Sequence, residues 1–276
     1  MTTVAQAIRE AAALLAASSD TARLDAEWLM AHALGTSRSD MLLRHMAEPA
    51  PGCFGGLVDR RAVHEPLAYI TGDTEFYART FEVGREVLIP RSDSEAVIEA
   101  ALDRLPEDAS GRVLDLGTGS GALLLTLLAE RPGMEGIGLD ASAAALAVAR
   151  RNADRLALGG RVRFVERDWC EPGWAGDLGA SEIVLCNPPY VETGAALKPD
   201  VRDYEPHEAL FAGPEGLDDY RRVIPDLPLL LAPGGVAVLE IGARQGPAVT
   251  RLAEAAGFEA EIRKDLADRP RAAILS

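Results

Sequence analysis

The chain has 276 residues, of which 48% are hydrophobic, and a formal net charge of −15 at pH 7. This composition is typical of a globular protein, and no apolar run approaches the length of a membrane span. The negative charge argues against a protein that binds bulk nucleic acid, since such proteins neutralise phosphates with a basic face, and it favours a basic partner. Three scattered cysteines exclude a disulfide framework or a zinc site, so we expect no metal and a cytoplasmic location.

The apolar spacing from residue 3 to about 66 predicts helices only, packed as a compact bundle of four or five short helices. We assign residues 1–68 to this first domain. Its first helix is amphipathic rather than a signal peptide, because polar residues interrupt the apolar pattern. Asp20 and Ser39 are the expected helix N-caps. The domain also contains one small basic cluster: Arg60, Arg61 and His64.

Residues 69–87 alternate in character and turn at Gly72 and Gly84, which predicts a hairpin linker. From residue 88 to 276, helical and strand-like segments alternate, which implies a parallel sheet with helices on both faces. The last two strands should form an antiparallel hairpin at the sheet edge. Strands are expected near 112–116, 136–139, 162–166, 182–186, 235–241, 258–263 and 271–275. Helices are expected near 93–105, 120–130, 142–157, 217–231 and 244–256.

The first strand of this region runs into a glycine-rich turn, and a long helical pattern follows. Glycines in such a turn let the backbone pass close to a ligand, and the N–H groups of the helix point toward it. The next strand ends at Asp140, whose carboxylate is well placed to accept hydrogen bonds from the two hydroxyls of a ribose. These features predict a nucleotide-like cofactor bound by Asp140 and the turn: Gly117, Thr118, Gly119, Ser120 and Gly121.

The type of cofactor follows from charge. Gly117, Gly119 and Ala122 also satisfy the dinucleotide fingerprint G-x-G-x-x-G/A, so an NAD-dependent oxidoreductase is an alternative. However, Asp115 stands just before the glycines, where its carboxylate would repel a pyrophosphate and attract an ammonium or sulfonium group. S-adenosylmethionine fits this arrangement better than NAD.

A second motif, Asn187-Pro188-Pro189-Tyr190, directly follows the expected strand 182–186. It should therefore lie at the carboxyl edge of the sheet, where ligands bind in open α/β folds. The prolines fix two φ angles and remove two N–H groups, which leaves a stiff loop with free carbonyls. Asn187 adds an amide oxygen and Tyr190 adds a flat aromatic face. Two acceptors beside a planar wall suit a planar NH2 group, such as an amide or an exocyclic amine.

With these motifs the chain resembles, over almost its whole length, the HemK-like family of protein-(glutamine-N5) methyltransferases. The most diagnostic segment is Ile89-Pro90-Arg91, which generic Asn-Pro-Pro-Tyr methyltransferases lack. The chain departs from the usual family pattern at Ser92 and Ala143, where proline is more common, and both positions are peripheral to the chemistry. The other matching segments are Tyr69-Ile70-Thr71-Gly72, Glu75-Phe76-Tyr77, Ser92-Asp93-Ser94-Glu95, Asp168-Trp169 and Asp200-Val201-Arg202-Asp203-Tyr204-Glu205-Pro206.

The resemblance implies a Rossmann-like, seven-stranded class I methyltransferase domain after a small all-helical domain that recognises the substrate. It implies S-adenosylmethionine as cofactor, with Asp168 and Trp169 bordering the adenine and Asn187 also near the cofactor. Arg91 and Glu95 are either a salt-bridged helix start or residues near the methionine end or the substrate. The residues expected to bind the acceptor are Asn187, Pro188, Pro189 and Tyr190, of which Asn187, Pro188 and Tyr190 are the expected catalytic residues.

The resemblance further implies that the acceptor is the glutamine of the Gly-Gly-Gln motif in class I release factors. We expect a monomer that acts on this protein partner without stable nucleic-acid binding. The nearest alternative is an adenine-N6 or guanine-N2 methyltransferase, whose Asn-Pro-Pro-Tyr loop holds an exocyclic amine but which needs an electropositive groove. A non-catalytic binding module is disfavoured, because the glycines, Asp140 and Asn187 are all intact.

Overall fold

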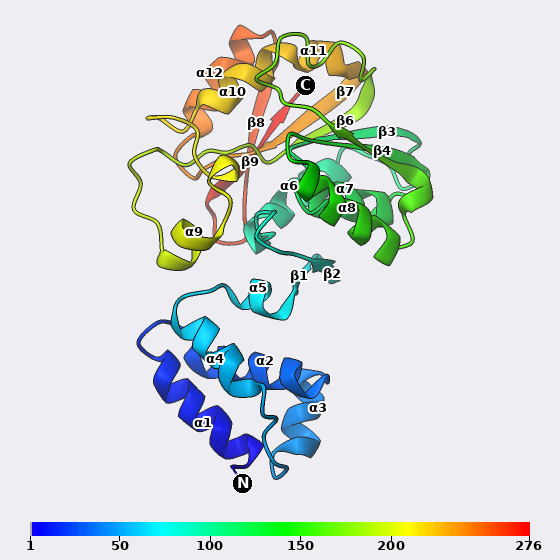
Figure 1. Cartoon of the computed structure of the whole chain (residues 1–276). Coiled ribbons are helices and arrows are strands. Elements are labelled where there is room, and N and C mark those ends of the chain that lie inside the picture. The colour runs from blue at the N-terminus through cyan, green and yellow to red at the C-terminus, as the bar shows by residue number, and fades with distance from the viewer. Residues whose placement is uncertain (1) are drawn as a thin grey trace. The chain divides into compact units, whose positions relative to one another are not determined.

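The computed structural model describes residues 2–276 and divides into two compact units. The helical unit comprises the chain up to Asp73 together with Leu197–Tyr204, and the sheet unit comprises Thr74–Ala196 and Glu205–Ser276. In Figure 1 the first part of the helical unit is blue to cyan, and the sheet unit runs from cyan-green to red. A segment of the long loop after Tyr190 therefore belongs to the helical unit, which the sequence did not indicate.

The helical unit is a bundle of short helices around its own apolar core, as predicted. Ile8, Leu29, Met30 and Met41 are fully buried in that core. The helices are α1 (Val4–Leu15), α2 (Ala22–Leu34), α3 (Arg38–Asp40), a π-helical turn (Met41–His45), α4 (Phe54–Ala62), α5 (Leu67–Thr71) and, from the inserted segment, α9 (Pro199–Tyr204).

Both expected N-caps are wrong by one or two residues. Ser39 lies inside α3, because the hydroxyl of Ser37 accepts the backbone N–H of Asp40 at 3.1 Å and so starts the helix earlier. The N-cap of α2 is Thr21 rather than Asp20. The Thr21 hydroxyl makes no capping bond and instead donates to the Asp25 carboxylate at 2.8 Å.

The hairpin between the two blocks is shorter than predicted. Residues 67–71 form α5, and Gly72 ends that helix in the left-handed conformation (φ 86°) instead of turning a hairpin. The hairpin consists of β1 (Asp73–Phe76) and β2 (Arg79–Glu82), joined by Tyr77 and Ala78, both with positive φ. Two left-handed residues match the right-handed twist of the flanking strands, which explains a tight turn here without glycine.

The sheet unit contains seven strands in the order β5-β4-β3-β6-β7-β9-β8. All neighbouring strands from β5 to β7 pair in parallel, and β9 is antiparallel to both β7 and β8. The antiparallel hairpin of the last two strands at the sheet edge agrees with the sequence prediction. The strands are β3 (Gly111–Leu116), β4 (Met134–Asp140), β5 (Val162–Glu166), β6 (Ser181–Cys186), β7 (Leu231–Glu240), β8 (Ala260–Lys264) and β9 (Pro270–Leu275).

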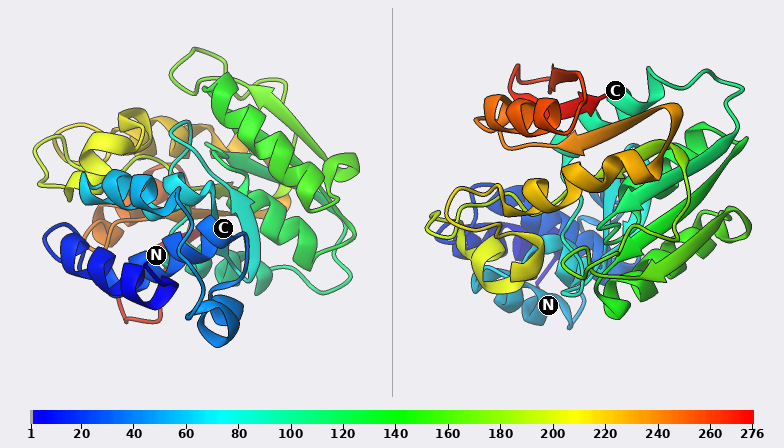
Figure 2. Two further views of the ribbon diagram at one scale, coloured as in Figure 1. Left: turned by 60° about the horizontal axis from the view of Figure 1, so that its bottom comes forward. Right: turned by 90° about the horizontal axis from the view of Figure 1, so that it is seen from above.

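Helices cover both faces of this sheet, and each face has its own core (Figures 1 and 2). One face packs against α6 (Glu95–Leu102), α7 (Ala122–Glu130) and α8 (Ala143–Arg155). The other packs against α10 (Asp218–Val223), α11 (Leu227–Leu230) and α12 (Gly246–Ala255). The inner strands β3, β4, β6, β7 and β9 are mostly apolar because both of their faces are covered, whereas the edge strands β5 and β8 carry charged residues and are only partly buried. None of the helices within residues 2–276 has the length and apolar content needed to cross a membrane.

The helix predicted over 217–231 is interrupted. It consists of α10, a 3₁₀ turn (Ile224–Asp226) and α11. Pro225 and Pro228 explain the interruption, because each lacks the N–H that would continue an α-helical hydrogen-bond ladder.

Candidate active site

The glycine-rich turn connects the end of β3 to the start of α7, at the carboxyl edge of the sheet. Gly117 has φ 70°, and a Cβ at this position would stand 3.0 Å from the Trp169 ring, so both the backbone angle and the close approach require glycine. The turn is tied to the neighbouring strand, since the backbone N–H of Thr118 donates to the carbonyl of Leu139 at 2.8 Å. The turn is therefore fixed before any ligand arrives.

Asp140, at the end of β4, uses both carboxylate oxygens to organise this turn. Its Oδ2 accepts the backbone N–H of Gly119 and its Oδ1 accepts that of Ser142, each at 2.9 Å. Burial raises the pKa of Asp140, and these backbone N–H groups partly offset the rise. Each oxygen retains a lone pair that can accept a further hydrogen bond, which is what two neighbouring hydroxyls would need.

A cavity of about 590 Å³ opens beside this turn, entirely within the sheet unit. The ends of β3, β4, β5 and β6 all contribute to its wall, as expected for a site at the carboxyl edge of a parallel sheet. Nine of the residues predicted from sequence line it: Gly117, Thr118, Gly119, Ser120, Asp140, Asp168, Trp169, Asn187 and Pro189. The predicted residues outside the lining are Arg91, Glu95, Gly121, Pro188 and Tyr190.

Trp169 stands against Gly117, and its ring is fixed from the other side. Its Nε1–H donates to the Asp219 carboxylate at 2.9 Å, and Asp219 also pairs with Arg222 at 3.0 Å. Asp219 and Arg222, both on α10, line the cavity as well. Sequence reasoning missed these two residues, because nothing in the helix itself indicates that it meets a tryptophan 50 positions earlier.

Asn187 follows the last residue of β6, the fully buried Cys186. Asn187 lines the cavity, and its side chain makes no hydrogen bond with any of residues 2–276. An amide oxygen without an internal partner, at the wall of a cavity, is available to a ligand. Among the same described residues, no cluster of three His, Cys, Asp or Glu side chains could hold a metal ion.

Arg91 and Glu95 are engaged in structural contacts away from the cavity. Arg91 forms an ion pair with Glu205, whose side chain is 1% exposed and which also accepts the backbone N–H of Ile89 at 3.4 Å. Glu95 accepts the backbone N–H of Tyr77 at 3.0 Å and so fixes the hairpin turn. Two other residues of the same segment, Pro90 and Ser94, line the cavity, although the sequence assigned neither of them a role in the site.

Asp115 is a deeply buried acid at this edge, with 1% of its surface exposed. Burial raises the pKa of Asp115 to about 7. The Thr118 hydroxyl donates to Oδ2 of Asp115 at 2.7 Å and opposes this rise, whereas the negative charge of Asp140 adds to the rise. Its other oxygen, Oδ1, makes no hydrogen bond with any described residue. A buried carboxylate with one unused oxygen beside the cavity is suited to a positively charged ligand group.

Comparison with known proteins agrees with this geometry. Residues 6–72 match the PrmC N-terminal domain, and residues 96–203 match the methyltransferase small domain. A release factor glutamine methyltransferase from Cereibacter sphaeroides is 42% identical over 275 residues, covering 97% of this chain and 96% of the relative. Another from Moorella thermoacetica is 43% identical over 277 residues, covering 98% and 96%. The chain belongs to the release factor glutamine methyltransferase family.

The fold of the sheet unit is common to methyltransferases beyond that family. A solved methyltransferase from Pyrococcus furiosus aligns with a TM-score of 0.50 at 14% identity, over 72% of this chain and 89% of that one. At that identity the likeness concerns the fold alone. The family relatives, in contrast, match both units, and the PrmC N-terminal match ends at residue 72, one residue before the helical unit's first segment ends. The seven-stranded methyltransferase architecture and the family predicted from sequence are thus confirmed.

Proposed function

We propose that this enzyme transfers a methyl group from S-adenosylmethionine to the side-chain amide nitrogen, N5, of the glutamine in the Gly-Gly-Gln motif of class I release factors. The family relatives support the acceptor, since they are release factor glutamine methyltransferases over nearly the full length. One structural observation carries the proposal. The glycine turn, Asp140 and Asn187, whose amide has no hydrogen-bond partner among residues 2–276, line the same cavity.

The cavity wall suits the chemistry of the cofactor. The Asp140 carboxylate would accept the ribose hydroxyls, Trp169 and Asp168 would border the adenine, and the unused oxygen of Asp115 would attract the positively charged end. When bound, S-adenosylmethionine supplies a methyl group on a positively charged sulfur. The fixed conformation of the turn means that little ordering is required on binding.

Asn187 and Pro188 would orient the acceptor. An amide nitrogen is a poor nucleophile because its lone pair is delocalised into the carbonyl. The Oδ1 atom of Asn187 and the carbonyl of Pro188 would each accept one N–H of the glutamine amide and direct the nitrogen lone pair toward the methyl group. Such positioning can supply on the order of 7 kcal/mol of the barrier, and the two acceptor bonds strengthen as positive charge develops on nitrogen.

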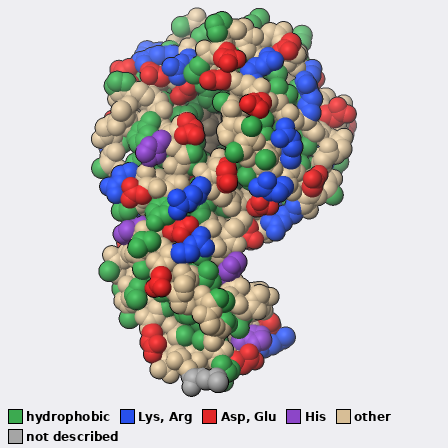
Figure 3. Space-filling view, viewed as in Figure 1, with side chains coloured by type: hydrophobic (Ala, Val, Ile, Leu, Met, Phe, Trp, Pro, Cys, Tyr) green, Lys and Arg blue, Asp and Glu red, His purple; other side chains and the backbone are tan. Residues whose placement is uncertain are grey.

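The charge distribution supports a protein acceptor over a nucleic acid. The small basic cluster of the helical unit is neutralised, since Arg61 is buried against Asp25 at 2.7 Å and Arg60 pairs with Glu65 at 2.8 Å. Acidic and basic side chains are interspersed over the face in Figure 3, with no large basic area on it. We therefore propose that the enzyme forms no stable nucleic-acid complex. We also propose that it acts as a monomer in the cytoplasm and binds the release factor through its helical unit.

A methyl-transfer assay with labelled S-adenosylmethionine tests this function. The enzyme should label a class I release factor and leave unlabelled the variant whose Gly-Gly-Gln glutamine is replaced by alanine. DNA and ribosomal RNA, offered in parallel, should remain unlabelled. Label on a nucleic acid instead of the release factor would overturn the acceptor while leaving the cofactor in place.

A further inference from the structure

Tyr190, the last residue of the Asn-Pro-Pro-Tyr loop, is fixed at two points behind the cavity wall. Its hydroxyl donates to Oε1 of Glu240 at 3.1 Å. Its backbone carbonyl accepts a hydrogen bond from Nε2 of Gln245 at 3.0 Å, and the same Nε2 donates to the carbonyl of Gly216 at 2.9 Å. Tyr190 is absent from the cavity lining, and these contacts hold its hydroxyl and its backbone carbonyl from outside the Asn-Pro-Pro-Tyr loop.

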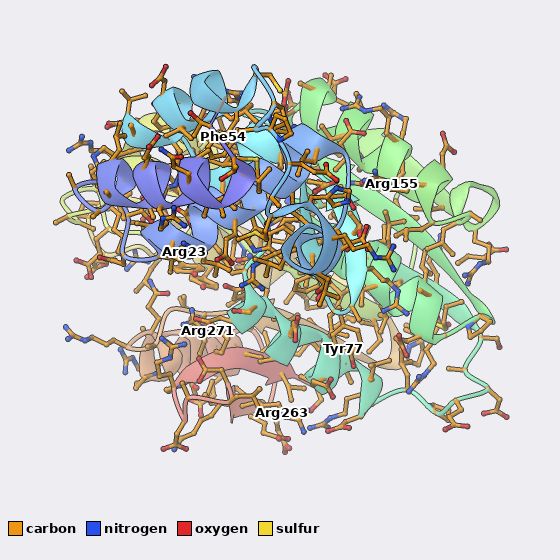
Figure 4. The ribbon with its side chains drawn as sticks, turned by 90° about the horizontal axis from the view of Figure 1, so that it is seen from below. Arg23, Phe54, Tyr77, Arg155, Arg263 and Arg271 are labelled. Atoms are coloured by element: carbon orange, nitrogen blue, oxygen red, sulfur yellow. The ribbon has the colours of Figure 1, made fainter. Side chains whose placement is uncertain are left out.

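Glu240 is a buried acid whose surroundings are arranged for this contact. It is the last residue of β7 and is 1% exposed. Burial raises the pKa of its carboxyl, and its hydrogen-bonding and cationic neighbours partly offset that rise. The main cationic neighbour is Arg271 on β9, labelled in Figure 4, whose Nη1 lies 4.0 Å from Oε1 of Glu240 and 3.4 Å from the Tyr190 hydroxyl.

The same cluster extends to a second segment that lines the cavity. Arg271 pairs with Asp93 at 3.0 Å. Asp93 precedes Ser94, which lines the cavity. Asp93 and Ser94 come directly after the Ile89-Pro90-Arg91-Ser92 segment. A chain of polar contacts, Asp93 to Arg271 to Glu240 and Tyr190, thus connects the start of α6 to the Asn-Pro-Pro-Tyr loop.

We propose that Glu240 and Arg271 are positioning residues for methyl transfer, an inference that rests on the function proposed above. They act through the Tyr190 hydroxyl and so set the orientation of the two hydrogen-bond acceptors on Asn187 and Pro188. The two prolines make the link between Asn187 and Tyr190 stiff, so a change at Tyr190 is transmitted to the acceptors instead of being absorbed. Catalytic groups must be placed to within about 0.5 Å of the productive geometry. Methyl transfer is therefore expected to depend on a contact that never touches either substrate.

The test is the kinetics of Tyr190→Phe, which removes the hydroxyl and keeps the ring. We expect kcat to fall about tenfold or more, because misplacement of this size is costly to catalysis. The KM for the release factor and the Kd for S-adenosylmethionine should stay within about twofold, since no contact with either is removed. Tyr77→Phe is the matched control, because it also removes a hydroxyl that donates to a carboxylate, that of Glu99, and Figure 4 shows Tyr77 apart from Arg271.

A double-substitution cycle that combines Tyr190→Phe with Glu240→Gln completes the test. Glutamine has nearly the shape of glutamate, so this substitution leaves no large cavity in the core. Glu240→Gln should lower kcat in the chain that retains Tyr190 and have little further effect in the Tyr190→Phe chain. An equal factor in both backgrounds, or a rise in KM with kcat unchanged, would overturn the inference. An unmodified enzyme that fails to label the release factor would overturn the proposed function and this inference together. An active enzyme whose kcat survives Tyr190→Phe within about twofold would overturn this inference alone.

Discussion

Gly216 lies so close to Tyr190 that a Cβ on the glycine would stand 2.2 Å from the Tyr190 carbonyl oxygen. Gly216 also has a left-handed backbone (φ 66°), and Gln245 bridges the carbonyls of the two residues. The Asn-Pro-Pro-Tyr loop thus rests directly on the backbone of the segment before α10. No side chain can be added at this position without displacing one of the two segments.

Gly216→Ala should therefore lower kcat by about tenfold or more, since the carbonyl of Tyr190 must move away. It should also lower the free energy of unfolding by more than the roughly 1 kcal/mol that a left-handed alanine costs. Gly257→Ala is the matched control, because Gly257 also has positive φ (91°) but has nothing within 4 Å of its Cβ position. Activity and urea unfolding of both variants check the prediction, and equal losses in the two would contradict it.

Asp140→Asn should weaken S-adenosylmethionine binding by roughly 10- to 100-fold, because charge-assisted hydrogen bonds to the ribose contribute about 1.5–3 kcal/mol. The turn should persist, since the asparagine oxygen can still accept one of the two backbone N–H groups. Isothermal titration calorimetry measures the change directly. Glu135→Gln, at the exposed opposite end of β4, should leave the affinity unaltered. Undiminished affinity in Asp140→Asn would remove this carboxylate from the cofactor site.

Asn187→Ala should lose most of kcat, by roughly 100-fold or more, since one of the two acceptors that orient the amide nitrogen is removed. Cofactor affinity should fall much less, because the turn and Asp140 are untouched. Single-turnover methyl transfer at saturating S-adenosylmethionine separates the two effects. If affinity for the cofactor dropped as far as the rate, the assigned role of Asn187 would be wrong.

The local pattern of apolar residues and motifs in the sequence was sufficient to predict the strands of the sheet and the principal residues of the cavity. The strand 162–166 is found at the predicted bounds, and the others deviate by four residues or fewer, because buried parallel strands form short apolar runs between turns. Motifs at strand ends could be placed in one cavity since all parallel strands end at the same edge. Asp140 and Asn187, far apart in sequence, meet the same cavity for this reason.

Contacts between distant segments could not be predicted in this way. The partners of Tyr190, namely Glu240 and Arg271, lie 50 and 81 positions later, on strands whose sequences look like ordinary core strands with one charge each. Their pairing depends on the order β6-β7-β9, which is a property of the whole sheet. The motif shows the aromatic ring of Tyr190, and its packing on the acceptor stays a prediction, but the buried partners of its hydroxyl could not be predicted from the motif.

Asp115 gives a prediction on pH and stability. Its pKa is about 7 in the folded chain, above its ordinary value, so the folded state binds this proton more tightly than the unfolded chain. Its contribution is absent below about pH 4, where both states are protonated. Stability should then fall as pH rises from about 4 to about 7 and level off above 7, by at most on the order of 4 kcal/mol in total. Asp115→Asn should remove this fall, because an amide cannot ionise.

Urea unfolding between pH 5 and 8 tests this prediction with the enzyme free of cofactor. The stability of Asp115→Asn relative to the unmodified chain should increase with pH, whereas Asp108→Asn, at an exposed turn before β3, should show no such trend. Adding S-adenosylmethionine should reverse the order at pH 8, because its positive charge favours the ionised carboxylate and is not attracted by an amide. A pH-independent difference between the two chains would contradict the buried, proton-binding state of Asp115. Equal stabilisation of both chains by the cofactor would instead place its charged end away from this residue.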